Sequence, residues 1–342
     1  MKSPLVTLII PCFNMGAKIN RLFDSILHQT YRNLQIVIVN DGSTDNSETI
    51  MKHYICLFKN EGFSAEYVYR ENGGLGAAIN TGLKYIKGDY FCWPDADDSL
   101  TPDSVEKKIV FLESNKEYAF VRSDAAVFFE DNLTKQIGFI SRKSPNRFKE
   151  TDLMEDYILE NNIIFCPGCH MVRTSAFKEV NPKMDIYEGR RGQNYQILLP
   201  LLYKFKFGFI DECLYNYIVY SNSMSRGDDT FDKCVIRFDG LQACIIETLK
   251  NMNMGEKDFI KYSSLTYQKY IYAKACKAYD FALREKYLFY RKQLTQERFV
   301  CKLRYIDNII NIPYSFELHR LMLRLKNKLK ANRIIYRLFR KG

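Results

Sequence analysis

The sequence lacks any long apolar run, any internal repeat and any low-complexity tract. No stretch approaches the ~20 apolar residues that a membrane-spanning helix requires. The apolar run Leu5–Ile10 is too short for a signal peptide, and Pro11 ends it. Tryptophan occurs only once, whereas tyrosine and phenylalanine each occur 24 times, a composition that argues against disorder. We therefore expect 342 ordered residues in one large domain or two medium ones, as in soluble globular proteins.

A cysteine framework is also absent. The ten cysteines show no short, even spacing, which in a chain of this length indicates reduced thiols and a cytosolic protein. The segment Cys166-Pro167-Gly168-Cys169-His170 matches the C-x-x-C-H pattern of haem attachment, but no second motif or export signal supports haem. Two cysteines are also too few ligands for a zinc site.

Acidic residues are scarce at the C-terminal end. From Ser315 to Gly342, nine Lys or Arg accompany one acid, Glu317, so this tail carries +8 of the net charge of +10. Its apolar residues fall on one helical stripe, and a basic amphipathic helix is typical of binding to an anionic membrane. A helix docked on the protein's own core is the alternative. A nucleic-acid-binding protein is a rival hypothesis, but the body is nearly neutral and shows no nucleic-acid motif.

Strand and helix patterns alternate through the first hundred residues. The predicted strands are 5–10, 34–39, 67–69 and 90–93, the helices between them lie near 19–27, 50–57 and 77–83, and another helix opens at Pro102. This alternation is typical of a doubly wound, mostly parallel sheet flanked by helices. Asn14, Asp41, Asn72 and Asp95 each follow a predicted strand. Because ligands bind at the carboxyl ends of such strands, we expect these four residues on one rim.

The pattern changes along the rest of the chain. Short β-like runs occur at 125–129 and 207–210, among helical segments. From 231 to 290 the sequence is helical in character, with no proline and only two glycines. We place a boundary near residue 220.

Five segments resemble, in order, the motifs of family 2 glycosyltransferases. They are Val6–Asn14, Ser25–Tyr31, Ile38–Asp45, Asn72–Gly82 and Asp95–Asp98. The likeness is strong over about the first hundred residues and loose over 165–220. It implies a GT-A fold, which is Rossmann-like, inverting transfer from a nucleotide-sugar, and a divalent metal. Residues 1–220 would then form the catalytic domain, with a donor half (1–100) and an acceptor half (101–220), followed by a helical region (221–342).

The acidic segment after the fourth strand is the candidate metal site. Loss of a nucleoside diphosphate builds negative charge in the transition state, and Mn²⁺ or Mg²⁺ on one or two carboxylates neutralises such charge. The resemblance assigns Asp97 to the metal and Asp95 to the ribose or the metal shell, with Ala96 between them in the donor site. A solvated acidic turn is the alternative. Asp41 would accept the imide N–H of uracil, or it is a turn aspartate.

The other donor-binding candidates come from two segments. The resemblance places Pro11, Phe13 and Asn14 beside the nucleotide base, where Phe13 stacks on the base or belongs to the core. Asn72-Gly73-Gly74 forms a glycine-rich loop that permits close approach of a ligand. Many family members carry Arg where this chain has Ile79, a departure that weakens the case for uridine recognition.

The general base is the main departure from the family. Inverting transfer needs a base for the acceptor hydroxyl, usually the Asp of a Glu-Asp pair at a helix start. The matching positions here are Gln193-Asn194, and an amide cannot act as a base. Glu188 is the candidate replacement, with Asp185 or a base elsewhere as alternatives, unless Glu188 is only a surface-loop residue. Arg190 and Arg191 are candidates for holding the diphosphate or an anionic acceptor, or they are solvated.

The C-x-x-C-H segment is best interpreted as a loop beside the acceptor site. His170 would then line the acceptor pocket, and a buried structural role is the alternative.

Together these features predict a metal-dependent inverting glycosyltransferase of the hexosyltransferase type. A UDP-sugar would be the donor, and a lipid-linked or oligosaccharide acceptor would place the enzyme in cell-surface polysaccharide or glycolipid biosynthesis. We expect a cytoplasmic protein, with residues 315–342 on the anionic inner face of the plasma membrane and no nucleic-acid partner. The sequence makes no prediction about oligomeric state. The rivals are a catalytically silent nucleotide-sugar-binding member and a nucleotidyltransferase, which would need a lysine-bearing glycine-rich N-terminal loop.

Overall fold

The structure is a computed structural model. It describes residues 3–141, 146–161, 163, 166–189, 191–220, 228–310, 318–319 and 321. The chain divides into two compact units, the first comprising 1–223 with 243–263 and the second 224–242 with 264–342. All ten cysteines lie in the described part and are free thiols. Among the described helices, none combines the length and apolar character that crossing a membrane demands.

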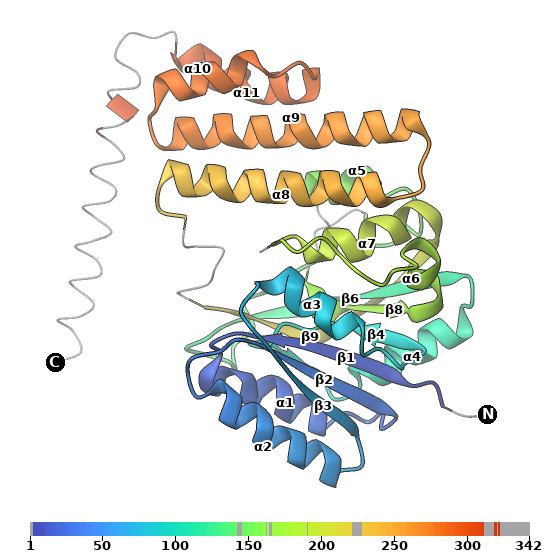
Figure 1. The fold of residues 1–342 in the computed structure, drawn as a ribbon. Coiled ribbons are helices and arrows are strands. Elements are labelled where there is room, and N and C mark those ends of the chain that lie inside the picture. Colours follow the sequence, from blue (N-terminus) through green and yellow to red (C-terminus); the bar gives the residue numbers. More distant parts are fainter. Residues whose placement is uncertain are drawn as a thin grey trace, which may run out of the picture. The chain divides into compact units, whose positions relative to one another are not determined.

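The first unit begins with alternating strands and helices (Figure 1). In chain order these are β1 (Val6–Cys12), η1 (Gly16–Lys18), α1 (Ile19–Leu27), β2 (Leu34–Asp41), α2 (Ser47–Asn60), β3 (Ser64–Arg70), α3 (Leu75–Leu83), β4 (Tyr90–Cys92), β5 (Ser99–Leu100) and α4 (Ser104–Ser114). The next elements are β6 (Tyr118–Phe129), β7 (Gly138–Phe139), α5 (Met154–Leu159), η2 (Pro167–Cys169), β8 (His170–Arg173), α6 (Thr174–Val180), α7 (Gln193–Lys204) and β9 (Lys206–Val219). The predicted alternation of strand and helix is confirmed.

The described strands form one sheet in the order β3-β2-β1-β4-β8-β6-β9-β5, with β7 paired to β6. The first four are mutually parallel, and β8 pairs antiparallel with both β4 and β6. β1 therefore lies between β2 and β4, so the chain leaves β1 toward one edge and later returns to its other side. In an open α/β sheet, the crevice at such a switch in strand order is where ligands bind.

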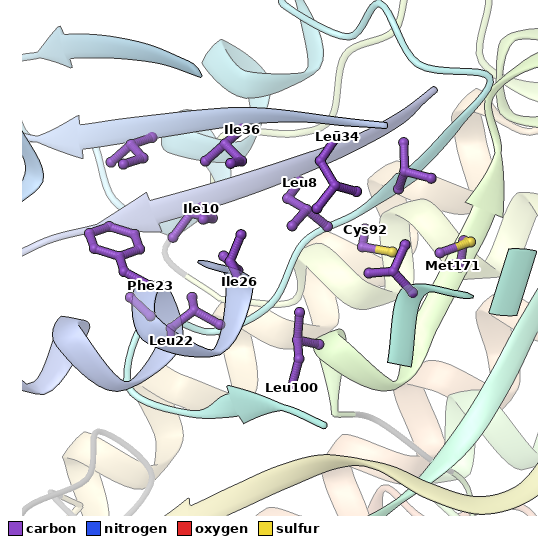
Figure 2. Packing of buried hydrophobic residues seen from close by; sticks show 14 of the residues in the cluster. Leu8, Ile10, Leu22, Phe23, Ile26, Leu34, Ile36, Cys92, Leu100 and Met171 are labelled. Carbon is purple, nitrogen blue, oxygen red and sulfur yellow. The ribbon is translucent and has the colours of Figure 1, made fainter. Parts of the chain in front are cut away.

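The two faces of the sheet follow from the alternation of side chains along β1. Leu8 and Ile10 have no exposed surface and pack on the face that α1 and α2 cover, beside Phe23 and Ile26 of α1 (Figures 1 and 2). On the opposite face Val37 and Val39 of β2 pack against α3. Because both faces are covered, these strands are continuous apolar runs rather than alternating ones.

The C-terminal part is helical, as predicted. Its helices are α8 (Phe231–Asn251), α9 (Glu256–Asp280), α10 (Arg284–Lys292) and α11 (Glu297–Ile310). Within the second unit, Asp307 joins α11 to α10 through an ion pair of 2.9 Å with Arg291 and a 2.6 Å hydrogen bond from the Tyr287 hydroxyl. The domain boundary near residue 220 stays a prediction, because residues 243–263 also belong to the first unit.

Candidate active site

The loops that follow β1 and β2 are tied together at one rim. Asn14 adopts the left-handed conformation (φ 50°), and its side-chain oxygen accepts a 2.8 Å hydrogen bond from the Thr44 backbone N–H. In return, the Asn14 N–H donates to the Ser43 hydroxyl over 3.1 Å. Just before Asn14, Phe13 is 43% exposed while Pro11 is buried. The structure thus brings the first two predicted clusters together and leaves an aromatic face open beside them.

Asp41 joins this rim to the glycine-rich loop. Its carboxylate is almost fully buried and accepts hydrogen bonds from the N–H groups of Gly73 (3.1 Å) and Gly74 (2.8 Å). Gly74 has φ 88°, a conformation that favours glycine, and this conformation helps aim its N–H at the carboxylate. Arg70 pairs with Asp41 in the register of β3 with β2, and its guanidinium lies 3.5 Å from the carboxylate. Sequence reasoning missed Arg70, which belongs to no motif.

The carboxylate of Asp41 keeps acceptor capacity despite these partners. A carboxylate offers about four lone-pair sites, and Asn72 bonds the Asp41 backbone carbonyl (3.0 Å) rather than the side chain. The predicted contact with a nucleotide base is therefore compatible with the local structure.

Three carboxyl groups crowd into the turn after β4. Asp95 and Asp97 are partly exposed, Ala96 between them is buried, and Asp98 is 1% exposed. Burial, reinforced by Asp97, raises the pKa of Asp95 to about 7. Burial and the charges of Asp95 and Asp97 raise the pKa of Asp98 well above its usual range, and burial also raises that of Asp97.

Among the described residues, the acidic turn lacks a hydrogen-bond partner for one oxygen of Asp98. The Oδ1 of Asp98 accepts a 2.7 Å hydrogen bond from the Ile218 N–H of β9, whereas its buried Oδ2 has no partner within hydrogen-bond distance in the described chain, although the nearby Tyr215 hydroxyl acts to lower the pKa of Asp98. Such an oxygen is costly to bury, and a nearby cation would relieve both the missing partner and the mutual repulsion. Within the described residues, no three His, Cys, Asp or Glu are placed to hold a metal by themselves. The turn therefore fits a cation that completes its shell with phosphate oxygens.

Two cations from the start of α1 face this acidic turn. Arg21 donates to the Asp97 backbone carbonyl (3.2 Å) and to the Tyr220 hydroxyl (2.7 Å), which itself donates to the same carbonyl (2.9 Å). Lys18 lies 4.1 Å above the Tyr220 ring. Both charges act to lower the pKa of Asp97, against the larger effect of burial. No motif marked Lys18, Arg21 or Tyr220; the only signal was basic residues three apart after the first strand.

The helix that carries the expected base position starts at Gln193. Asn194 is nearly buried, and its side-chain oxygen accepts a 2.8 Å hydrogen bond from the indole N–H of Trp93. Trp93 directly follows β4. The amide at this position therefore fixes α7 to the end of β4, beside the acidic turn.

Glu188 belongs to the segment before α7 and lies beside α3, near Asn80. Its carboxylate is exposed and lies 3.4 Å from the Asn80 side-chain nitrogen. Asn80 also bonds the backbone N–H and carbonyl of Ile186, each over 2.6 Å. The Gly76 N–H donates to the Gly189 carbonyl over 3.1 Å. The structure thus brings Glu188 to the helix that begins at the glycine-rich loop, 108 residues earlier in the chain.

The remaining candidates are His170, Arg190 and Arg191, of which His170 and Arg191 differ in burial. His170 has no exposed surface, stacks on Trp93 and is 3.0 Å from the Cys166 carbonyl, surroundings that favour the structural alternative. Burial, aided by Arg122, lowers its pKa to about 3. Arg191 is partly exposed and has interaction partners. Arg190 lies outside the described residues.

Comparison with known proteins shows to which family the chain belongs. The sequence model of the family described as Glycosyl transferase family 2 matches residues 7–180, half of the chain. The chain belongs to glycosyl transferase family 2. Its sheet and helices form the GT-A type of fold, as the sequence predicts.

Similar proteins come from several bacteria. An uncharacterized glycosyltransferase of Rickettsia typhi is 44% identical over 110 residues, which is 32% of each chain. The minor teichoic acid biosynthesis protein GgaB of Bacillus subtilis is 25% identical over 264 residues, 75% of this chain and 28% of that protein. The chain therefore matches about a third or less of the length of these relatives.

Two solved structures share the fold. Staphylococcus aureus TarS 1–349 in complex with UDP has a TM-score of 0.61 at 15% identity, over 95% of this chain and 91% of that one. The mannosyltransferase PcManGT of Pyrobaculum calidifontis in complex with GDP-Man and Mn²⁺ has a TM-score of 0.53 at 14% identity, over 96% and 88%.

Proposed function

We propose that this protein is a metal-dependent, inverting glycosyltransferase that moves a sugar from a UDP-sugar to a hydroxyl group of a cell-surface glycan or glycolipid. The observation that carries the proposal is the crowded acidic turn Asp95–Asp98 at the end of β4, beside the switch point of the sheet. Carboxyl groups whose pKa values are raised by burial and, for Asp95 and Asp98, also by neighbouring carboxylates are suited to a cation, as is a buried, unpartnered oxygen.

A divalent metal fits this turn. Asp97 and Asp95 would hold Mn²⁺ or Mg²⁺, which would neutralise the charge that develops on the departing diphosphate. Lys18 and Arg21 add positive charge on the side of Asp97. The GDP-Man and Mn²⁺ bound to PcManGT support this assignment.

The donor nucleotide would lie along the rim between β1 and β2. Asp41 would accept a base N–H with the lone pairs that Gly73 and Gly74 leave, and Phe13 would offer its exposed ring for stacking. Pro11, Asn14 and Asn72 would hold the loops around it. The UDP bound to TarS supports a uridine donor.

Glu188 would take the proton of the acceptor hydroxyl. Its carboxylate is exposed to solvent and held near Asn80, on the segment that docks on the glycine-rich helix. Asn194 cannot serve, because an amide has no basic lone pair and because its oxygen already accepts the Trp93 N–H. Asp185, on the same segment, stays the alternative base.

A catalytically silent member that only binds nucleotide-sugar is the second candidate. The observation that favours it is Asn194 itself, which occupies the expected base position and makes a structural contact. The two functions differ in turnover and not in donor binding.

Membrane binding by residues 315–342 also stays a proposal, because most of this tail lies outside the described residues. Within the second unit, the His319 ring stacks on the Tyr279 ring, and a His319 ring nitrogen lies 3.0 Å from the Tyr279 carbonyl oxygen. These contacts favour docking of the start of the tail on α9. Leu318 and Leu321 are 59% and 53% exposed, which leaves this part of the apolar stripe open. We propose that the tail docks at its start and presents its remaining apolar stripe to an anionic surface.

The test is release of nucleoside diphosphate from a panel of nucleotide-sugars by the full-length protein with Mn²⁺, with and without EDTA. We expect release from one donor that EDTA abolishes. Nucleotide binding without release from any donor would favour the silent member, and release that EDTA leaves unchanged would exclude the metal.

A further inference from the structure

A pocket is formed in part by residues 180–187, on the segment that carries Glu188. Its volume is about 440 Å³, within the ~300–1,000 Å³ that small-molecule sites occupy. Three stretches of the first unit line it: residues 180–187, the α7 side chains Gln196 and Pro200, and residues 247–252 from the end of α8 onward. None of these residues belongs to the donor rim.

The lining has the chemistry of a site for a neutral sugar. Tyr187 is 44% exposed and offers a ring face for the apolar face of a sugar. Asn251, Asp185 and Glu247 supply amide and carboxylate groups, which pair with neighbouring hydroxyls. The lining holds two carboxylates and one cation, Lys183, and Glu247 also pairs with Lys250 over 2.7 Å, so the pocket has no excess of positive charge to attract phosphate and other anions.

One stretch of chain forms both the wall of this pocket and the edge of the candidate active site. On one side, Gln196 of α7 accepts from the Tyr187 N–H and donates to its carbonyl (2.9 Å). On the other side, Asn80 of α3 holds both backbone groups of Ile186. Because extended chain advances at most ~3.6 Å per residue, Glu188 lies only a few ångströms beyond this wall.

The wall is held rigidly between two helices. Gly76 of α3 approaches so closely that an added Cβ would lie 2.6 Å from the Gly189 carbonyl oxygen. Both polar groups of Tyr187 and of Ile186 are bonded to side chains from different helices. A ligand in the pocket would therefore be fixed in position relative to Glu188 without rearrangement of the segment.

We propose that this pocket binds a neutral saccharide unit of the acceptor and thereby directs an adjacent hydroxyl toward Glu188. The inference rests on the proposed glycosyltransferase function and adds the chemistry of the acceptor: a neutral glycan of at least two units, not a polyol phosphate.

The test is saturation-transfer NMR on the full-length protein with N,N′-diacetylchitobiose, lactose and maltotriose as neutral probes and glycerol 3-phosphate as the anionic one. We expect at least one neutral probe to bind. Asn251→Trp, at an exposed position on the lining, fills the pocket and should weaken that binding at least tenfold. Glu247→Gln should weaken it severalfold, and Glu256→Gln, exposed in the first turn of α9 away from the pocket, should not.

Folding of each variant is checked by thermal unfolding, and donor hydrolysis without acceptor is measured in parallel. Binding of no neutral probe, binding that Asn251→Trp leaves unchanged, or binding of glycerol 3-phosphate alone would overturn the proposal. Donor hydrolysis separates the two claims: hydrolysis without saccharide binding contradicts only the pocket, and saccharide binding without hydrolysis of any donor contradicts only the proposed function.

Discussion

Glu188 is the residue on which the proposed chemistry depends most, because the position at which we expect the family's base holds an amide, Asn194. Its position is set by contacts of its neighbours: Asn80 holds Ile186, and Gly76 holds Gly189. Glu188 itself keeps an exposed carboxylate, which a general base needs in order to reach a substrate hydroxyl.

We predict that Glu188→Gln lowers turnover by about 10²–10⁴-fold, the usual contribution of a general base, because the amide cannot take a proton. Nucleotide binding should be unchanged, since Glu188 does not touch the donor rim. Steady-state kinetics with the donor found in the panel, together with nucleotide titration, check both parts.

Asp185→Asn is the matched variant, because Asp185 is an exposed carboxylate on the same segment. A loss of kcat at saturating acceptor in Asp185→Asn, with kcat kept in Glu188→Gln, would transfer the role of base to Asp185, whereas a raised KM for the acceptor alone would reflect its place in the pocket lining. Turnover kept in both would place the base elsewhere.

The lowered pKa of His170 predicts how the free energy of unfolding depends on pH. Burial lowers its pKa to about 3, while the unfolded chain binds the proton near the ordinary value of about 6.5. The unfolded state therefore binds more protons between these values, and the free energy of unfolding falls as the pH falls, by up to about 1.4 kcal/mol per unit. Above pH 7 this residue has no such effect.

His170→Phe removes the titrating group and keeps a ring beside Trp93. Between pH 7.5 and pH 5.0 the wild type should lose about 2 kcal/mol more unfolding free energy than the variant, as measured by urea denaturation. Parallel losses in the two proteins would show that His170 is protonated in the native state.

At this scale, residue patterns pointed to some of the residues that the structure places together and missed others. Asp95 and Asp97 could be proposed as metal ligands because two carboxylates after an apolar strand form a short, ordered motif, and that role stays a prediction. Lys18 and Tyr220 were missed because they come to the acidic turn from positions about 200 residues apart, and only the folded chain makes them neighbours.

Among the elements, α3 is the one whose backbone packs directly on the segment that carries Glu188. Its first turn packs backbone against backbone on residues 187–189, at the distance that Gly76 permits. This contact connects the glycine-rich loop to the segment that carries Glu188.

We therefore predict that Gly76→Ala destabilises the protein by about 1–3 kcal/mol and lowers turnover, because its Cβ displaces the Gly189 carbonyl. Gly240→Ala is the matched control: it is also helical, but its Cβ meets nothing within 4 Å, so it should stabilise by about 0.5–1 kcal/mol. Thermal unfolding and kinetics of both variants check this. Equal effects of Gly76→Ala and Gly240→Ala on stability would show that the contact between α3 and Gly189 has room for a methyl group.

The elements of the first hundred residues could be predicted because buried parallel strands are continuous apolar runs. The full length of β9 could not be predicted: the sequence predicted a strand at 207–210, and the structure extends it to Lys206–Val219, with many partly exposed residues, no regular alternation of burial and an irregular register against β6. Helix starts were also displaced. α2 begins at Ser47, before the predicted segment 50–57, and α4 begins at Ser104, two residues after Pro102.

At the scale of the whole molecule, the GT-A fold with its C-terminal helices agrees with the sequence prediction, and the charge is concentrated in the tail. Nine Lys or Arg within residues 315–342 would together favour the proposed binding to an anionic surface, since each basic residue contributes about 1 kcal/mol there.

Deletion of residues 315–342 should abolish co-sedimentation with vesicles that contain phosphatidylglycerol, while neither protein binds pure phosphatidylcholine vesicles. Binding of the full chain should weaken as salt is raised, because screening shortens the reach of the charges. Vesicle binding that survives the deletion would contradict the membrane role of the tail, and lost binding to RNA or DNA would instead favour the nucleic-acid rival.

The central claim, that the acidic turn after β4 holds a catalytic metal, is tested most directly by Asp97→Ala. In the presence of Mn²⁺, release of nucleoside diphosphate from the donor should fall by at least about 10²-fold, toward the level with EDTA. Asp131→Ala, at an exposed aspartate in the loop after β6, should release it at the wild-type rate. Full, EDTA-sensitive turnover in Asp97→Ala would contradict the account.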